Sequence, residues 1–328
     1  MGKYRKLLAI AGIICMTNCL TGCGNIQKED VPKESTQHES IPKENSKDEG
    51  VPEKTEQDTL TMEKKLESLK QIDSVRKINS TAASECGMNL YEITYFSDEY
   101  KVKGFVVVPE KMEKENASTK CIIYNRGGNG DYGKVISDEI VSVAQTFQCI
   151  VFASQYRGTS GCEGKDEFGG AELTDVTTLI DICQECGLVD MEQLYMMGIS
   201  RGGMMTYMTI RNDERIKKAV VISGIADLFM SCEERQDMLE LCQNLIGSSP
   251  SEAPEEYQKR SATYWADQIK CPVLIIHSKE DEKVSFLQAE KMDECLSQAG
   301  IEHKLVTYED GGHGIHQQDA QVISEWLE

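Results

Sequence analysis

A serine flanked by glycines lies between an apolar run and a helical pattern, where its hydroxyl could act as a nucleophile. Residues 194–197 are typical of a buried strand and residues 204–210 of a helix, so the motif GISRG at residues 198–202 occupies a strand-to-helix turn. This spacing is that of a nucleophile elbow, in which glycine neighbours permit a strained serine backbone. We therefore expect Ser200 to be an exposed nucleophile. The alternative is a glycine-rich loop without chemistry.

A serine nucleophile needs an imidazole to accept its proton and a carboxylate to orient that imidazole. Of the five histidines, His313 lies in a glycine-rich loop between the last predicted strand and the last predicted helix, and His316 is its near rival. His277 and His303 flank strands and are expected to have structural roles. Asp281 follows a strand that lies between serine and base in chain order, and Asp227 is the second candidate acid.

An acyl-transfer site also needs two donors for the oxyanion. The backbone N–H of Arg201 at the elbow is the expected first donor. The second is expected from the loop after residues 121–124, at Arg126 or Gly127, because its glycines allow close backbone approach. This loop lacks the lysine pattern of a phosphate-binding loop, so we predict no nucleotide there.

Eight apolar or alternating runs predict strands, and five segments have a helical pattern, four of them between the later runs and one after the last. The strands are expected at residues 90–96, 102–108, 121–124, 149–153, 194–199, 219–223, 273–277 and 304–308, and the helices at 134–146, 173–186, 202–211, 286–299 and 317–327. The first two strands suit an antiparallel hairpin. The rest suit buried parallel strands with crossover helices, so the expected class is α/β with a mostly parallel eight-stranded sheet.

The amino terminus is typical of a bacterial lipoprotein. Three basic residues precede a short apolar run, and the tetrad at residues 20–23 (LTGC) resembles a lipobox, in which Cys23 would be lipidated. The alternative is an ordinary signal peptide. We predict a signal peptide over 1–22, a disordered polar tether over 23–58 that contains three proline-bearing decamers, and one catalytic domain over 59–328.

The formal net charge of -20 disfavours nucleic acid as a partner. Of the 13 cysteines, Cys183 and Cys186 have a redox or zinc-like spacing, but they fall on a predicted helix and no second such pair occurs. We therefore predict no metal and no cofactor. The disulfide state of the ten cysteines after Cys23 stays open.

Several motifs taken together resemble the catalytic domain of the prolyl oligopeptidase family of serine peptidases, within the α/β-hydrolase superfamily. They are the elbow and residues 156–161 (YRGTSG), 254–261 (PEEYQKRS), 269–277 (IKCPVLIIH) and 311–314 (GGHG). The resemblance implies that Ser200 is the nucleophile, Asp281 the orienting acid and His313 the base. Members usually have a His-Gly-Gly type oxyanion loop where this chain has Asn125-Arg126-Gly127-Gly128. The segment before the domain is too short for the family's β-propeller.

Access to the site would then depend on the segment 226–268. Its apolar side chains would either line a substrate pocket or pack a small lid: Phe229, Met230, Met238, Leu239, Leu241 and Leu245. The expected function is a membrane-tethered serine hydrolase that acts outside the cell, through an acyl-enzyme, on short peptides or small esters. A carboxylesterase and a non-catalytic surface binding protein with this fold are the alternatives.

Overall fold

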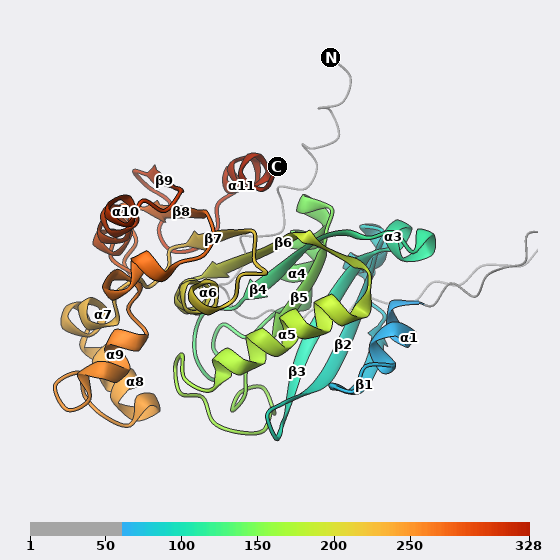
Figure 1. Ribbon diagram of the computed structural model, residues 1–328, viewed down its shortest axis with the longest axis horizontal. Helices are drawn as coiled ribbons and strands as arrows, with labels where there is room; N and C mark the ends of the chain where they lie inside the picture. The colour runs from blue at the N-terminus through green and yellow to red at the C-terminus, as the bar shows by residue number, and fades with distance from the viewer. Residues whose placement is uncertain (1–60) are drawn as a thin grey trace, which may run out of the picture. The chain divides into compact units, whose positions relative to one another are not determined.

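A computed structural model of the chain describes residues 61–328, in which nine strands form one sheet with helices on both faces (Figure 1). The strands are β1 (Ile72–Ile78), β2 (Met88–Ser97), β3 (Tyr100–Pro109), β4 (Thr119–Asn125), β5 (Ile150–Ser154), β6 (Val189–Ile199), β7 (Lys218–Ile222), β8 (Val273–Ser278) and β9 (His303–Tyr308). The predicted signal peptide, tether and Cys23 lie outside the described residues.

The helices that flank this sheet follow the predicted pattern, with further short helices near the amino end and in the lid. They are α1 (Met62–Glu67), α2 (Thr81–Glu85), α3 (Glu110–Glu115), α4 (Ser137–Phe147), α5 (Glu172–Cys186), α6 (Arg201–Asn212), α7 (Leu228–Glu234), α8 (Gln236–Ile246), α9 (Pro254–Lys259), α10 (Leu287–Ala299) and α11 (Asp319–Leu327). Within residues 61–328, no helix has the length and apolar character needed to cross a membrane.

The sheet has the strand order β1-β2-β3-β5-β4-β6-β7-β8-β9. The pairs β1–β2, β2–β3 and β3–β5 are antiparallel, and the strands from β4 to β9 run parallel to one another. The predicted α/β class and the antiparallel hairpin are therefore confirmed. The predicted number of eight strands is one too few, because β1 adds a ninth strand at the edge.

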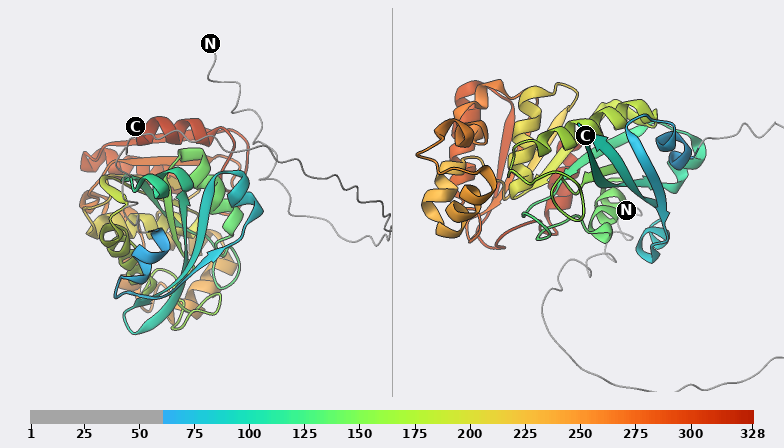
Figure 2. Two further views of the ribbon diagram at one scale, coloured as in Figure 1. Left: turned by 90° about the vertical axis from the view of Figure 1, so that its right-hand side faces the viewer. Right: turned by 90° about the horizontal axis from the view of Figure 1, so that it is seen from below.

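Both faces of the sheet are covered, which explains the continuous apolar runs of its central strands. All five residues of β5 are buried. One core cluster joins the sheet to α1, α5, α6 and α10, and a second joins the opposite face to α2, α4 and α11. Figure 2 shows these two helical layers from two further directions. The predicted stripe on α11 docks as expected, with Ile323 and Leu327 buried.

The segment between β7 and β8 forms a small lid of three helices, α7, α8 and α9, which lie beside α10 at the β8–β9 side of the sheet (Figures 1 and 2). Of the six apolar side chains predicted to line a pocket or pack a lid, Met238 lies in the larger core cluster and four pack against it, namely Phe229, Leu239, Leu241 and Leu245. The sixth, Met230, is also buried. The Phe229 ring lies 5.6 Å from each of the rings of Tyr257 and Tyr264. These contacts favour lid packing over a pocket lining.

The ten cysteines of residues 61–328 are all free thiols in the structure. Cys183 and Cys186 lie on α5, as the sequence pattern indicated, and both are buried. Cys121, Cys149 and Cys271 are also buried, which is the common environment of a thiol that serves as a small apolar side chain.

Candidate active site

Ser200 occupies a sharp turn between β6, which ends at Ile199, and α6, which begins at Arg201. Its backbone has φ 58° and ψ -122°, which is neither extended nor helical. A side chain rarely adopts such a conformation, and residues that do are concentrated at functional sites. The turn therefore has the backbone geometry of a nucleophile elbow.

The two glycines of the elbow are required by close packing. A Cβ added at Gly198 would lie 2.0 Å from the carbonyl oxygen of Gly202, and one added at Gly202 would lie 2.0 Å from that of Asn125. Both distances are far below a van der Waals contact. The spacing seen in the sequence thus has a steric cause, since the helix and the end of β4 pass directly against the turn.

The predicted acid and base are in direct contact. His313, in the loop between β9 and α11, places its Nδ1 atom 2.9 Å and 3.0 Å from the two carboxylate oxygens of Asp281. An ionised carboxylate only accepts hydrogen bonds, so Nδ1 must carry the proton and Nε2 of the neutral ring is left to accept one. This is the tautomer that a general base beside a serine requires.

Asp281 is held in its ionised form. Burial alone would raise its pKa, but hydrogen bonds from His277, His313 and the backbone amide of Val284 outweigh burial and hold the pKa of Asp281 well below its ordinary value. Its Oδ1 atom accepts from the amides of Lys283 and Val284 at 2.9 Å and 3.0 Å. The carboxylate is therefore charged and fixed in orientation before any substrate binds.

The end of β7 connects the serine to the histidine loop. The Ser200 amide donates to the carbonyl of Ile222 at 3.0 Å, and the amide of Gly314 donates to Oγ of Ser223 at 3.2 Å. Ile222 and Ser223, at the end of β7, thus hold the serine turn and the loop that carries His313. Within residues 61–328, no hydrogen bond joins Ser200 Oγ to His313. Hydrogen bonds between catalytic groups are often long without substrate and shorten when substrate binds.

The rival acid and base have other partners. His316 bonds through Nε2 to the carbonyl of Gly311 at 2.8 Å and lies edge-on to Tyr308. Asp227 caps the amino terminus of α7 and forms an ion pair with Lys291 at 3.1 Å. Neither is part of the Asp281–His313 pair, so the geometry favours the first choices made from the sequence.

The strands β4 and β7 lie on the two sides of β6 in the sheet. The glycine-rich loop after β4 therefore approaches Ser200 from the side of β6 opposite to β7. A Cβ added at Gly127 would lie 3.3 Å from Cβ of Ser200 and 3.1 Å from the carbonyl of Ile199. Among the described residues, neither the amide of Gly127 nor that of Arg126 donates to a protein acceptor. Gly127 is thus the residue of the loop with a demonstrated approach to the serine.

The sequence did not reveal how Arg126 is used. Its side chain is buried and donates to the carbonyls of Gly127, Gly130 and Tyr132 at 3.2 Å, 2.9 Å and 3.1 Å, and to Gln155. The guanidinium therefore holds the backbone of the loop. An arginine beside glycines gives no sequence signal for such a role.

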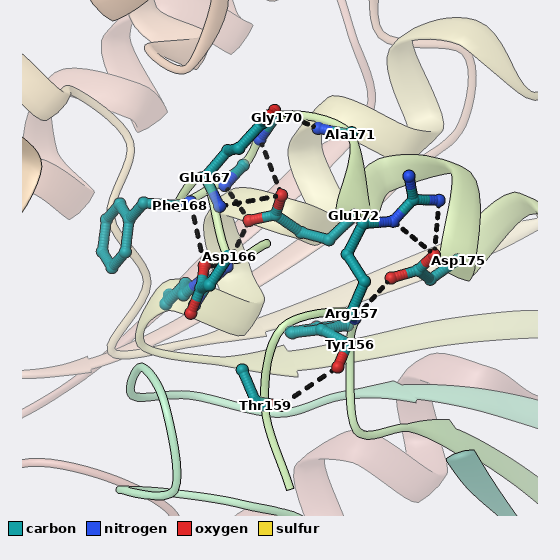
Figure 3. Close-up of polar contacts among 12 residues, drawn as sticks. Tyr156, Arg157, Thr159, Asp166, Glu167, Phe168, Gly170, Ala171, Glu172 and Asp175 are labelled. Atoms are coloured by element: carbon teal, nitrogen blue, oxygen red, sulfur yellow. Dashed lines mark hydrogen bonds and ion pairs between the residues drawn. The ribbon is translucent and has the colours of Figure 1, made fainter. Parts of the chain in front are cut away.

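A cluster of buried ion pairs beneath the site was also missed. Arg201 pairs with Asp166 and Glu172, and Arg157 pairs with Asp175. Figure 3 shows Glu172 turned toward the backbone of residues 167–170 and Arg157 facing Asp175. In a sequence, charged residues in a loop are typical of a solvated surface, which is why this cluster was not predicted.

His277 is the remaining residue of functional interest. It is buried at the end of β8, and its Nε2 lies 2.9 Å from the carbonyl of Val284 and 3.3 Å from Oδ2 of Asp281. The expected structural role thus includes holding the loop that carries the acid. Residues 61–328 contain no group of three or more His, Cys, Asp or Glu side chains arranged to hold a metal ion.

Comparison with known proteins places this geometry in a family. A profile of the prolyl oligopeptidase family matches residues 125–328. The uncharacterized peptidase YtmA of Bacillus subtilis is 33% identical over 213 residues, which cover 64% of this chain and 80% of that protein.

Among solved structures, Pyrococcus horikoshii acylaminoacyl peptidase aligns with a TM-score of 0.65 and 21% identity, over 77% of this chain and only 44% of that one. An acetyl xylan esterase from a Paenibacillus species aligns with a TM-score of 0.62 and 15% identity, over 77% of this chain and 87% of that one. These two likenesses concern the fold. The profile match and the identity to the bacterial peptidase show that the chain belongs to the prolyl oligopeptidase family of serine peptidases.

Proposed function

We propose that Ser200, His313 and Asp281 form a catalytic triad that cleaves short peptides or small esters through an acyl-enzyme. The observation that carries this proposal is the Asp281–His313 pair, bonded at 2.9 Å and held at the same strand end as the strained serine. His313 would accept the Ser200 proton as Oγ attacks the substrate carbonyl carbon. The ionised Asp281 would stabilise the imidazolium that results.

The oxyanion formed in this attack would be bound by two backbone amides. One is the N–H of Arg201 at the start of α6. The second is assigned to Gly127 in preference to Arg126, because Gly127 lies against the serine. His313 would then protonate the leaving amine or alcohol. Water, activated by the same histidine, would release the acyl group from Ser200.

A peptide substrate is favoured because the 33%-identical relative is named a peptidase. A carboxylesterase is the second candidate, since an acetyl xylan esterase shares the fold over 87% of its chain. The two reactions use the same machinery and differ in how much help the leaving group needs. An amine must be protonated as it departs, whereas an alkoxide departs more readily.

Side-by-side kinetics separate these candidates. The protein would be assayed with short acyl esters and with aminoacyl and dipeptidyl anilides, with Ser200→Ala as the blank. Serine-dependent cleavage of anilides would support a peptidase, and turnover of esters alone would support a carboxylesterase.

Ser200→Ala is expected to lower kcat by about 10⁶-fold, because the triad and its nucleophile act as a unit. Labelling by a fluorophosphonate provides an independent measurement, since only an activated serine reacts at a useful rate. Labelling of the wild type and not of the variant is expected. Retention of most activity in the variant would contradict the assignment of Ser200 as the nucleophile. A wild-type protein that neither labels nor turns over would instead favour a non-catalytic binding protein.

We further propose that the chain is a lipoprotein anchored through Cys23 at the outer side of a bacterial membrane. The lipobox-like tetrad at residues 20–23 supports this proposal. Growth with a radiolabelled fatty acid should label the wild-type chain in the membrane fraction. Cys23→Ser should abolish the label and release the protein, whereas Cys19→Ser, inside the leader, should not. Equal labelling of wild type and Cys23→Ser would contradict the proposal.

A further inference from the structure

The residue after the nucleophile carries a buried charge. The Arg201 side chain is 1% exposed, and its two terminal nitrogens donate to the two carboxylate oxygens of Asp166 at 2.7 Å and 2.9 Å and to Glu172. The guanidinium also lies 4.7 Å from the Phe168 ring centre and 5.3 Å from that of Tyr156. A charge this far from water is tolerated only where partners fix it, so its position is tightly determined.

The same guanidinium reaches the oxyanion loop. It donates to the carbonyl of Gly128 at 3.2 Å, and its partner Asp166 accepts from the amide of Gly130 at 3.3 Å. Arg201 and Asp166 thus bond to the loop from beneath. The loop is the segment that would supply the second oxyanion donor, whereas the first donor is the backbone of Arg201 itself.

Together the two buried arginines determine which way the loop's backbone faces. The Arg126 guanidinium donates hydrogen bonds to the carbonyls of Gly127, Gly130 and Tyr132, and the Arg201 guanidinium donates to that of Gly128. A carbonyl bound to a guanidinium cannot turn toward the substrate, where it would repel an oxyanion. Among residues 61–328, no protein acceptor takes the amides of Gly127 or Gly128, so these N–H groups stay available.

We propose that the Arg201 side chain is a positioning residue that holds the two walls of the oxyanion hole, its own amide and the Gly127–Gly128 backbone, at a fixed separation. This inference rests on the proposed hydrolase function. The two donors of an oxyanion hole must converge on one oxygen atom before the reaction, since their effect depends on preorganisation. The buried Arg201 side chain supplies that constraint, because it belongs covalently to the residue that carries one donor and bonds to the Gly128 carbonyl beside the other.

Arg157 offers a matched control. Its side chain is 3% exposed and pairs with Asp175 and Asp98, and the residue lies between β5 and α5, in the connection that also carries Asp166. Its contacts reach the β2–β3 turn through Ser97 and do not include the oxyanion loop. Arg157→Lys therefore disturbs a comparable buried ion pair without altering a contact to the Arg201 amide or to the Gly127–Gly128 backbone. It measures how much such a change lowers the free energy of unfolding by itself.

Arg201→Lys is the test variant, because an ammonium keeps the charge but cannot bond Asp166 and Gly128 as a planar fork. We expect kcat to fall by about 10²–10³-fold, the usual effect of losing an oxyanion donor, with KM changed by less than about threefold. The pH profile should keep its shape, since the Asp281–His313 pair is intact. A trifluoromethyl ketone, which forms a tetrahedral adduct on the serine, should bind more weakly by about the same factor as kcat/KM falls.

Hydrogen exchange of the backbone gives a readout that needs no activity. Peptides covering residues 126–133 should exchange faster in Arg201→Lys than in wild type, and at the wild-type rate in Arg157→Lys. Where Arg201→Lys does not fold, Asp166→Asn replaces it, because it keeps the side-chain volume and weakens the bonds to Arg201 and Gly130. A smaller fall in kcat of about tenfold is then expected, as for one weakened donor.

The outcomes separate this inference from the proposed function. Equal loop exchange in the Arg201 and Arg157 variants, or full kcat in a folded Arg201→Lys, would overturn the positioning role. Faster exchange confined to the Arg201 variant would support the positioning role of Arg201. Absence of serine-dependent turnover in the wild type would contradict the proposed hydrolase function but not this positioning role.

Discussion

Asp281 is the carboxylate on which the geometry of the general base depends. Replacement by asparagine should lower kcat by about 10⁴-fold with little change in KM, because a neutral amide can stabilise the wrong tautomer of His313 and does not stabilise the imidazolium. The control is Asp227→Asn, which alters the other candidate acid at the cap of α7. It should keep kcat within about threefold, since Asp227 has no contact with His313. Equal losses in the two variants would mean that the acid has been misassigned.

The same residue gives a pH dependence of stability. The native pKa of Asp281 lies below its ordinary value of 3.8, so its stabilising effect is complete above about pH 5 and is lost as pH falls through 3.8 toward the native pKa. The difference in free energy of unfolding between wild type and Asp281→Asn should therefore shrink as pH falls from about 5 to about 3. Urea unfolding at several pH values measures it, and a difference that grows on acidification would contradict the assignment.

At the scale of elements, the elbow depends on the close contact between β6, α6 and the end of β4. Gly198→Ala should lower the free energy of unfolding by about 3 kcal/mol or more, because its Cβ would lie 2.0 Å from a backbone oxygen that cannot move alone. Gly300→Ala, at the end of α10, is the matched control. Gly300 has φ 69° with nothing within 4 Å of an added Cβ, so only the backbone cost of about 1–2 kcal/mol is expected. Similar midpoints in urea for both variants would argue against the steric explanation.

The elements that the sequence predicted are those whose burial leaves a periodic signal. The central strands are buried on both faces and read as apolar runs, and α11 carries its stripe at helical spacing. β1 was missed because it lies at the edge of the sheet with no fully buried residue and has charged residues along it. Such a strand owes its conformation to pairing with β2, which a local pattern does not contain.

The candidate site divides in the same way. Ser200, Asp281 and His313 could be proposed from the sequence because a fixed topology brings the loops after successive strands to one edge of the sheet. The choice between Arg126 and Gly127 as the second oxyanion donor stayed open there, since a backbone amide has no side-chain signature. The buried ion pair of Arg201 and Asp166 could not be predicted, because the two residues are 35 positions apart and meet only through the fold.

At the scale of the whole molecule, every proposed catalytic group and its supports lie within residues 61–328, which have their own core on both faces of the sheet. A chain beginning at residue 59 should therefore fold without the preceding segment. Its kcat/KM for small soluble substrates should stay within about twofold of that of the full chain, because the proposed catalytic residues and the residues that hold them all lie within 61–328. Its melting temperature should change by less than about 3 °C, equivalent to about 1 kcal/mol for a domain of this size. Scanning calorimetry and steady-state kinetics of the two chains in detergent provide the comparison. A large loss of either property in the shorter chain would mean that the first sixty residues take part in the catalytic unit, and that the tether interpretation is wrong.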